Sequence, residues 1–237
     1  MVYKDCDVGS AKPSKELLKK YPHHLIDHLT PNEIFTAADF CKYSMSAIKN
    51  AHIKKKLPVF VGGSMMYFKS LFYGMHNLPE RDQELRDKLK SINDDYYLFS
   101  RLKEVDPNYA KTLNKNDETR IIRALEVYEK TGKRISYILD KNLKNNLSSK
   151  FNVFQFCLNH NRDIIHSRIK KRLNKIIDHG LINEVKELAR KYDISENHPV
   201  KKSINYKQAF DYLEKKYDYE TFFNKALYAT RQLAKRQ

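Results

Sequence analysis

The chain has 237 residues, of which 45 are Lys or Arg and 29 are Asp or Glu, giving a net charge of +16. A hydrophobic share of 41% can bury a core, so the composition excludes a wholly disordered chain. Three scattered cysteines exclude a disulfide-stapled miniprotein and favour a reducing compartment. There is no apolar run of roughly 18–20 residues and no signal-peptide core, so we expect a cytoplasmic protein without membrane contact.

The excess of positive charge has two explanations. Lys and Arg attract phosphate backbones, so the charge fits a nucleic-acid partner. Abundant Lys, Asn, Ile and Tyr, with only six Gly and no Trp, are equally what an AT-rich genome would encode. Charge alone leaves both open.

The first predicted elements are a helix and a buried strand. Residues 36–56 read as a helix, with Thr36 and Asp39 as a capping box. The run from Leu57 that ends in Gly62-Gly63-Ser64 reads as a strand entering a tight turn. A helix followed by a buried strand is half of an α/β unit.

The next stretch is helical in pattern. A short apolar helix follows Ser64 and ends at Gly74, and residues 80–152 are polar with almost no β-rich run. The strongest helix there is 117–130, which Asp117 can cap and Gly132 can end.

The last third returns to mixed character. Residues 151–158 are apolar and aromatic, which predicts a second buried strand. Residues 162–178 form an amphipathic helix with a basic face, stopped by Gly180, and a final helix runs from Tyr219 to the end.

Several residue groups suggest chemistry, and each has a plainer explanation. The Gly62-Gly63-Ser64 turn could approach a ligand, or Ser64 could merely cap a helix. Arg168 and Arg172 lie one turn apart and could clamp a diphosphate, or face solvent. Arg120 and Arg123 also lie about one turn apart, and they could contact an RNA backbone or face solvent. No spacing of His, Cys, Asp or Glu predicts a metal site.

Six blocks in fixed order resemble the tRNA dimethylallyltransferase family, also called tRNA isopentenyltransferases. Together they span the chain from end to end, which makes the resemblance highly specific. The blocks are VYK (2–4) with DVGSAKP (7–13), PHHLID (22–27), TAADF (36–40), PVFVGGSMMYFK (58–69), NDETRIIRALE (116–126) and ATRQLAKRQ (229–237).

The resemblance implies transfer of a dimethylallyl group from its diphosphate to the exocyclic amine of the adenosine beside the tRNA anticodon. Mg²⁺ normally helps to neutralise the leaving diphosphate in this family. Ser64 matches the family Thr whose hydroxyl meets the target adenine, and we predict a catalytic role for it. Arg172 and Arg168, in HSRIKKR (166–172), match diphosphate contacts.

The family also implies tRNA contacts at three places. A later basic loop of the family corresponds to KSINYK (202–207), where two Arg have become Lys and a Gly has become Asn205. Asn tolerates positive φ better than most residues, so the turn can survive. The predicted tRNA contacts are Arg86, Thr119, Arg120, Ile121, Ile122, Arg123, Lys202, Ser203, Ile204, Asn205, Tyr206 and Lys207.

The implied fold is α/β, with an incomplete P-loop NTPase-like parallel-sheet core and an α-helical insertion domain. We expect core segments at 1–79 and 153–237, and an insertion at 80–152 that contacts the tRNA anticodon stem-loop. The family binds nucleotides through this type of fold. We expect the protein to be a monomer.

The chain departs from the family pattern at both ends. It contains no GxxxxGK[ST] phosphate loop. The family Asp that serves as general base would lie three residues before Met1, and the family continues beyond Gln237. We therefore expect the chain alone to be inactive. Two rivals remain: a non-catalytic RNA-binding remnant and an adenylate isopentenyltransferase that modifies free nucleotides.

Overall fold

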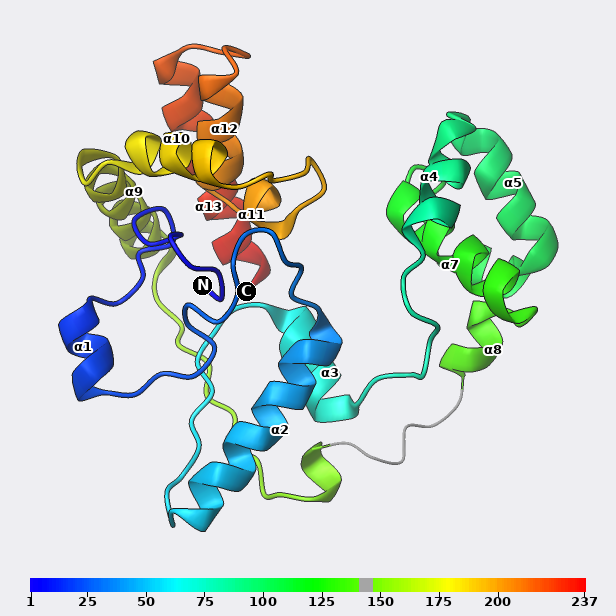
Figure 1. Ribbon diagram of the computed structural model, residues 1–237, viewed down its shortest axis with the longest axis horizontal. Helices are drawn as coiled ribbons and strands as arrows, with labels where there is room; N and C mark the ends of the chain where they lie inside the picture. The colour runs from blue at the N-terminus through cyan, green and yellow to red at the C-terminus, as the bar shows by residue number, and fades with distance from the viewer. Residues whose placement is uncertain (141–146) are drawn as a thin grey trace. The chain divides into compact units, whose positions relative to one another are not determined.

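The computed structural model describes residues 1–140 and 147–237 and divides the chain into two compact units (Figure 1). Unit 1 combines residues 1–70 with residues 154–237, and unit 2 is the continuous stretch 71–153. The stretch 80–152, predicted to be a helical insertion, falls within unit 2. Its separate role as a tRNA-contacting domain stays a prediction.

Unit 1 is a helical assembly around one apolar core. Helix α9 packs against α13, α10 against α12, and α12 against α11 and α13. Tyr3 and Cys6 from the start of the chain share this core with Leu181, Tyr206 and Phe222. The helices are α1 (Lys15–Lys20), α2 (Ala37–Ile53), α3 (Met65–Tyr73, ending in unit 2), α9 (Arg162–Asp178), α10 (Leu181–Lys191), α11 (Pro199–Lys202), α12 (Tyr206–Leu213) and α13 (Tyr219–Arg236).

The capping signals of unit 1 are confirmed. Thr36 Oγ1 accepts from the Asp39 amide at 3.1 Å, and Asp39 accepts from the Thr36 amide at 2.9 Å, so the capping box starts α2. Helix α9 has the predicted bounds, and Gly180 follows it with φ +97°, a conformation that favours glycine.

Unit 2 has its own core, built around α7. Helix α7 packs against α4, α5 and α8, and it buries Ile121, Leu125 and Val127. Asp117 accepts from the Arg120 amide at its start, and Gly132 ends it with φ +65°, as predicted. The helices are α4 (Gln83–Ser91), α5 (Asp95–Val105), α6 (Pro107–Ala110), α7 (Glu118–Thr131) and α8 (Ile135–Leu139), with a 3₁₀ turn at Leu147–Ser149.

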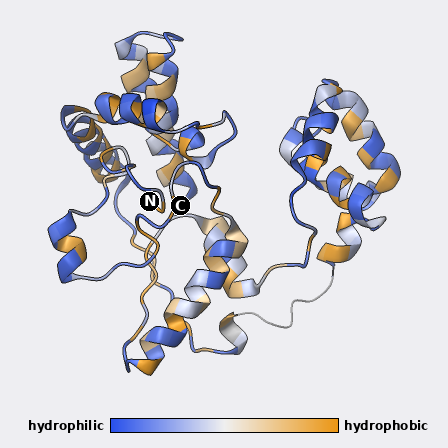
Figure 2. Cartoon of the chain, in the orientation of Figure 1, coloured by the Kyte–Doolittle hydropathy of each residue, from blue (hydrophilic) through white to orange (hydrophobic). Residues whose placement is uncertain are grey.

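The predicted strands are not formed in the described residues. The one pairing between non-helical segments there is a single parallel bridge between Tyr3 and Leu29. The segments 57–64 and 151–158 were predicted to be buried, yet Val61 is 93% exposed and Phe156 is 90% exposed. Figure 2 draws both segments as coil with hydrophobic colouring. A strand needs a neighbouring backbone to complete its hydrogen bonds. Among the described residues, no backbone hydrogen bond joins either segment to a neighbouring strand. The parallel-sheet core is therefore not confirmed.

Six large apolar side chains are exposed along these two segments: Leu57, Val59, Val61, Phe154, Phe156 and Leu158. Exposed apolar patches bind hydrophobic dyes and promote association. We predict that replacing both Val61 and Phe156 by Lys lowers dye fluorescence and light scattering. The free energy of unfolding should change by less than about 0.5 kcal/mol, because neither side chain is packed.

Tyr96→Lys is the matched control for this prediction. Tyr96 is 78% exposed but lies on helix α5 and belongs to neither segment. Its replacement should leave dye binding unchanged. A drop in stability of more than about 1 kcal/mol in the double variant would mean that the two segments are packed in solution.

Candidate substrate site

The Gly62-Gly63-Ser64 turn leads directly into α3. The Ser64 carbonyl accepts from the Tyr67 amide at 2.9 Å, so this residue starts the helix through its backbone. Ser64 is exposed, and among the described residues none hydrogen-bonds its hydroxyl. The Gln237 side chain donates to the Gly63 carbonyl at 3.3 Å, and a Cβ on Gly63 would lie 1.9 Å from Gln237 Nε2. Gly63 therefore permits the end of α13 to approach the turn.

A loop near the start of the chain is held by one carboxylate of α10. The amides of Asp7 and Val8 donate to Glu184 Oε2 at 2.9 and 2.6 Å, and the Gly9 amide donates to Oε1 at 3.0 Å. The Tyr206 hydroxyl donates to the same Oε1 at 2.7 Å. Burial raises the pKa of Tyr206 and the Glu184 charge raises it further, so the phenol keeps the proton that it donates.

This loop brings two predicted site elements together. Arg172 Nη2 donates to the Ser10 carbonyl at 3.3 Å, and Asn205 Nδ2 donates to the Gly9 carbonyl at 2.9 Å. Asn205 has φ +72°, so the positive φ foreseen at this position is confirmed. Asn205, from the segment 202–207, and Arg172 of α9 therefore both bind the loop 7–10.

The individual residues of 202–207 differ in exposure. Lys202 and Lys207 are exposed, and the Lys202 ammonium donates to Asn197 at 2.8 Å. Ser203 and Ile204 are half-buried, and the Ser203 hydroxyl donates to the Pro199 carbonyl at 2.7 Å. Tyr206 is fully buried. Only the two lysines therefore present charge that a ligand can reach.

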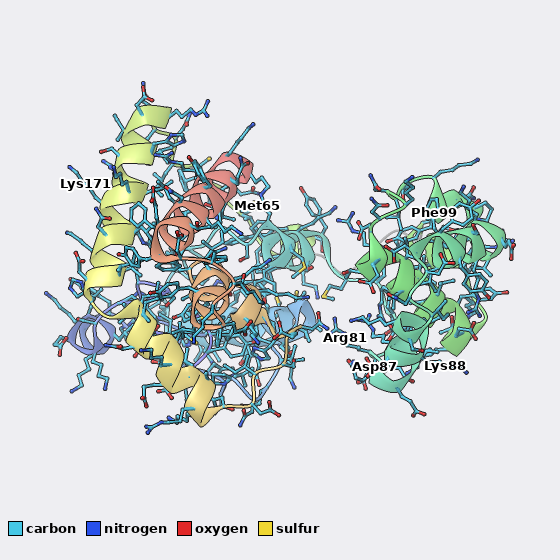
Figure 3. The ribbon with its side chains drawn as sticks, turned by 90° about the horizontal axis from the view of Figure 1, so that it is seen from above. Met65, Arg81, Asp87, Lys88, Phe99 and Lys171 are labelled. Carbon is cyan, nitrogen blue, oxygen red and sulfur yellow. The ribbon has the colours of Figure 1, made fainter. Side chains whose placement is uncertain are left out.

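Helix α9 carries a continuous basic face. Arg168, Lys171, Arg172 and Lys175 are exposed and fall within about a third of the helix circumference. Figure 3 shows Lys171 projecting outward from this helix. In the part of the chain that the structure describes, none of the four is within ion-pair distance of a carboxylate. Such a face is suited to a phosphate ligand.

In unit 2, two of the predicted RNA contacts, Arg86 and Arg123, bind a buried carboxylate. Glu126 is fully buried and accepts from Arg86 Nε at 2.9 Å, Arg86 Nη2 at 2.8 Å and Arg123 Nη1 at 2.5 Å. The Asp82 amide adds a bond of 2.6 Å. Burial alone would raise the pKa of Glu126, but these hydrogen bonds outweigh it and lower the pKa to about 2.

The remaining predicted contacts of unit 2 divide by burial. Ile121 and Ile122 are 1% and 2% exposed, so their side chains belong to the core and cannot reach a ligand in this structure. Thr119 and Arg120 are exposed at the start of α7. Arg120 pairs with Asp117 at 3.1 Å, and such surface pairs exchange readily because they contribute little energy.

The two glutamates that organise these sites were not predicted. Glu184 and Glu126 look like ordinary surface residues of amphipathic helices in the sequence. The loop amides are 175 or more residues from Glu184, and Arg86 and the Asp82 amide are 40 and 44 residues from Glu126. Local spacing therefore indicates only the pair of Glu126 with Arg123.

The predicted Mg²⁺ has no protein cage among the described residues. No group of three or more His, Cys, Asp or Glu side chains there could hold a metal ion. Of the carboxylates at the loop 7–10, Asp7 binds Lys12 at 2.5 Å and Glu184 is bound by amides. The side chains present therefore do not fit a resident ion.

The Glu126 cluster generates a prediction about stability. In Glu126→Gln, Arg86 and Arg123 lose their charged partner while staying half-buried, so we expect a loss of about 3–5 kcal/mol. Because the pKa of Glu126 is lowered, its stabilisation is complete above its unfolded value of 4.5 and is lost as pH falls towards 2. Thermal unfolding from pH 7 to pH 2 measures both effects.

Glu129→Gln is the matched control, since Glu129 lies one turn further along α7 and pairs with the partly exposed Arg101. Its cost should stay below about 1 kcal/mol. Equal effects of the two substitutions would mean that Glu126 is solvated and that Arg86 and Arg123 are free for RNA.

No helix among the described residues is long and apolar enough to cross a membrane.

Comparisons with known proteins identify the family of this chain. The family model described as IPP transferase matches residues 1–237. A tRNA dimethylallyltransferase of Acinetobacter baumannii (strain SDF) is 41% identical over 248 residues, covering 100% of this chain and 78% of the relative.

Two solved structures are also similar. The tRNA isopentenylpyrophosphate transferase of Bacillus halodurans matches with a TM-score of 0.66 and 30% identity, over 100% of this chain and 73% of that one. A eukaryotic dimethylallyltransferase acting on tRNA matches with a TM-score of 0.81 and 27% identity, over 99% and 60%. Sequence and fold agree from end to end, and the chain belongs to the IPP transferase family of tRNA-modifying prenyltransferases.

Proposed function

We propose that the chain serves the transfer of a dimethylallyl group from dimethylallyl diphosphate to the exocyclic amine of the adenosine beside the tRNA anticodon. The main observation in support of this proposal is the basic face of α9. Its Arg172 donates to the Ser10 carbonyl, next to the Gly9 carbonyl that Asn205 binds. An exposed group of cations without acidic partners suits a leaving diphosphate.

On the donor side, Arg172 and Arg168 bind the diphosphate. Lys202 and Lys207, which lie on the neighbouring loop, contact the phosphates of the tRNA. Guanidinium groups match phosphate oxygens in pairs, whereas lysines act as point charges. Ser203, Ile204, Asn205 and Tyr206 shape the loop that presents these lysines. Mg²⁺ would supply further charge neutralisation when bound with the diphosphate.

On the acceptor side, the free hydroxyl of Ser64 bonds the target adenine, and Thr119 and Arg120 contact the RNA backbone. Ile121 and Ile122 fix the start of α7 from within the core. Arg86 holds α4 against α7 through Glu126, and Arg123 ties α7 to the Pro79 carbonyl. The outer edges of both arginines add positive potential. The anticodon stem-loop is the proposed RNA partner.

In the reaction, the adenosine amine attacks the first carbon of the dimethylallyl group. The new C–N bond forms as the C–O bond to the diphosphate breaks, and a base takes the proton of the amine. The cations of α9 stabilise the charge on the departing diphosphate.

The 237 residues hold no phosphate loop, so we expect them to bind RNA and orient diphosphate without completing transfer when tested alone. A non-catalytic RNA-binding protein is the rival reading. A monomer remains the expected state.

The test incubates the chain with unmodified tRNA, dimethylallyl diphosphate and Mg²⁺, followed by nucleoside mass spectrometry. The Acinetobacter relative is the positive control, and free AMP replaces tRNA in a parallel reaction. We expect tRNA binding that weakens steeply with salt, and product only from the relative. Product from the chain alone would contradict its inactivity, and modified AMP would favour the adenylate enzyme.

Two arginine substitutions should separate binding of the prenyl diphosphate from binding of RNA. Arg172→Ala should weaken binding of inorganic pyrophosphate with Mg²⁺ while leaving tRNA affinity unchanged. Arg120→Ala should do the reverse, and should reduce the slope of log affinity against log salt by about one unit. Arg190→Ala, an exposed arginine of α10, is the control. If Arg190→Ala lowered pyrophosphate and tRNA affinity as much as the other two substitutions, the losses would reflect net charge and not specific contacts.

A further inference from the structure

Three successive amides converge on one carboxylate at the loop 7–10. Asp7, Val8 and Gly9 donate to Glu184 at 2.6–3.0 Å. Successive backbone N–H groups of this kind form a concavity that binds anions. Here an acidic side chain from α10 fills the concavity, and the Tyr206 hydroxyl completes its coordination at 2.7 Å.

The opposite edge of the loop carries the substrate-site residues. The Gly9 carbonyl accepts from Asn205 and the Ser10 carbonyl from Arg172, while the Ser10 hydroxyl closes the loop on the Cys6 carbonyl at 2.7 Å. Planar peptide units link each amide to the carbonyl of the preceding residue. The three bound amides therefore fix the carbonyls of Cys6, Asp7 and Val8. The Val8 carbonyl accepts from the Ala11 amide at 2.9 Å. This amide shares a peptide plane with the Ser10 carbonyl, so the direction of the carbonyl that Arg172 binds is restricted in turn.

Packing leaves the loop little freedom to adopt another position. A Cβ on Gly9 would lie 2.7 Å from Tyr206 Cζ and 2.8 Å from Leu181 Cδ1. Both of these neighbours are fully buried. The loop can approach the core this closely because Gly9 has no side chain, and the approach brings its amides to Glu184.

We propose that Glu184 is a positioning residue of the donor site, acting through the loop 7–10 on Arg172 and Asn205. This inference rests on the proposed function, in which Arg172 binds the diphosphate. A carboxylate is required because four donors surround it. A glutamine of the same shape has one acceptor oxygen, and its NH₂ group would face donors.

The principal test compares Glu184→Gln with Glu187→Gln. Glu187 is an exposed glutamate of the same helix, paired with Arg190. Amide hydrogen exchange at Asp7, Val8 and Gly9 reports on the loop, and titration with inorganic pyrophosphate and Mg²⁺ reports on the donor site. Binding of tRNA reports on the RNA contacts, and far-UV circular dichroism with thermal unfolding reports on folding.

For Glu184→Gln we expect exchange at the three amides to speed up, and pyrophosphate affinity to fall, by about tenfold each. The tRNA affinity should fall by less than about threefold, because Thr119 and Arg120 lie outside this loop and the exposed Lys202 and Lys207 act as point charges. Glu187→Gln should change none of the three. A purely structural role for Glu184 would lower the helical content together with pyrophosphate binding and would overturn the proposal.

Tyr206→Phe is the second variant, in case Glu184→Gln does not fold. It removes one donor from the carboxylate without touching the loop amides, and an intermediate loss of pyrophosphate affinity is expected. Unchanged exchange and affinity in both variants would overturn the proposal. If the wild-type chain binds no pyrophosphate, the donor role of Arg172 fails, and the exchange data alone decide whether Glu184 orders the loop.

Discussion

Unit 1 depends on the hydrogen bonds between the Glu184 carboxylate and the loop near the start of the chain. This contact joins α10 to a segment 175 or more residues away and sets the backbone to which Arg172 and Asn205 bind. The surrounding core of Leu181, Tyr206 and Cys6 explains why the contact is tight. Burial raises the pKa of the Cys6 thiol to about 12, so no competing negative charge arises beside Glu184.

Unit 2 uses a buried glutamate differently. Glu126 gathers two arginines, whereas Glu184 gathers backbone amides. The arginine cluster fixes α4 on α7, but it also engages cations that would otherwise attract RNA. The exposed Arg120 and the lysines of unit 1 are then the better candidates for phosphate contact.

Local sequence signals predicted the helices well. The Thr36 capping box, the Asp117 cap and the glycines at 132 and 180 act within a few residues, so a single sequence displays them. The strands predicted at 57–64 and 151–158 did not form, because an apolar run becomes a strand only when a neighbouring backbone pairs with it. For the candidate site, the resemblance indicated Arg172 and Asn205, but their shared loop and Glu184 depend on contacts across the whole chain.

The discontinuity of unit 1 has a consequence for how the protein emerges during synthesis. Unit 2 is one continuous stretch with its own core and can fold once its residues have left the ribosome. The loop 7–10 must wait for Glu184 and Tyr206, which at 5–20 residues per second means a delay on the order of ten seconds. During that interval Tyr3 and Cys6 have no core to enter, and the first 70 residues are exposed to chaperones and proteases.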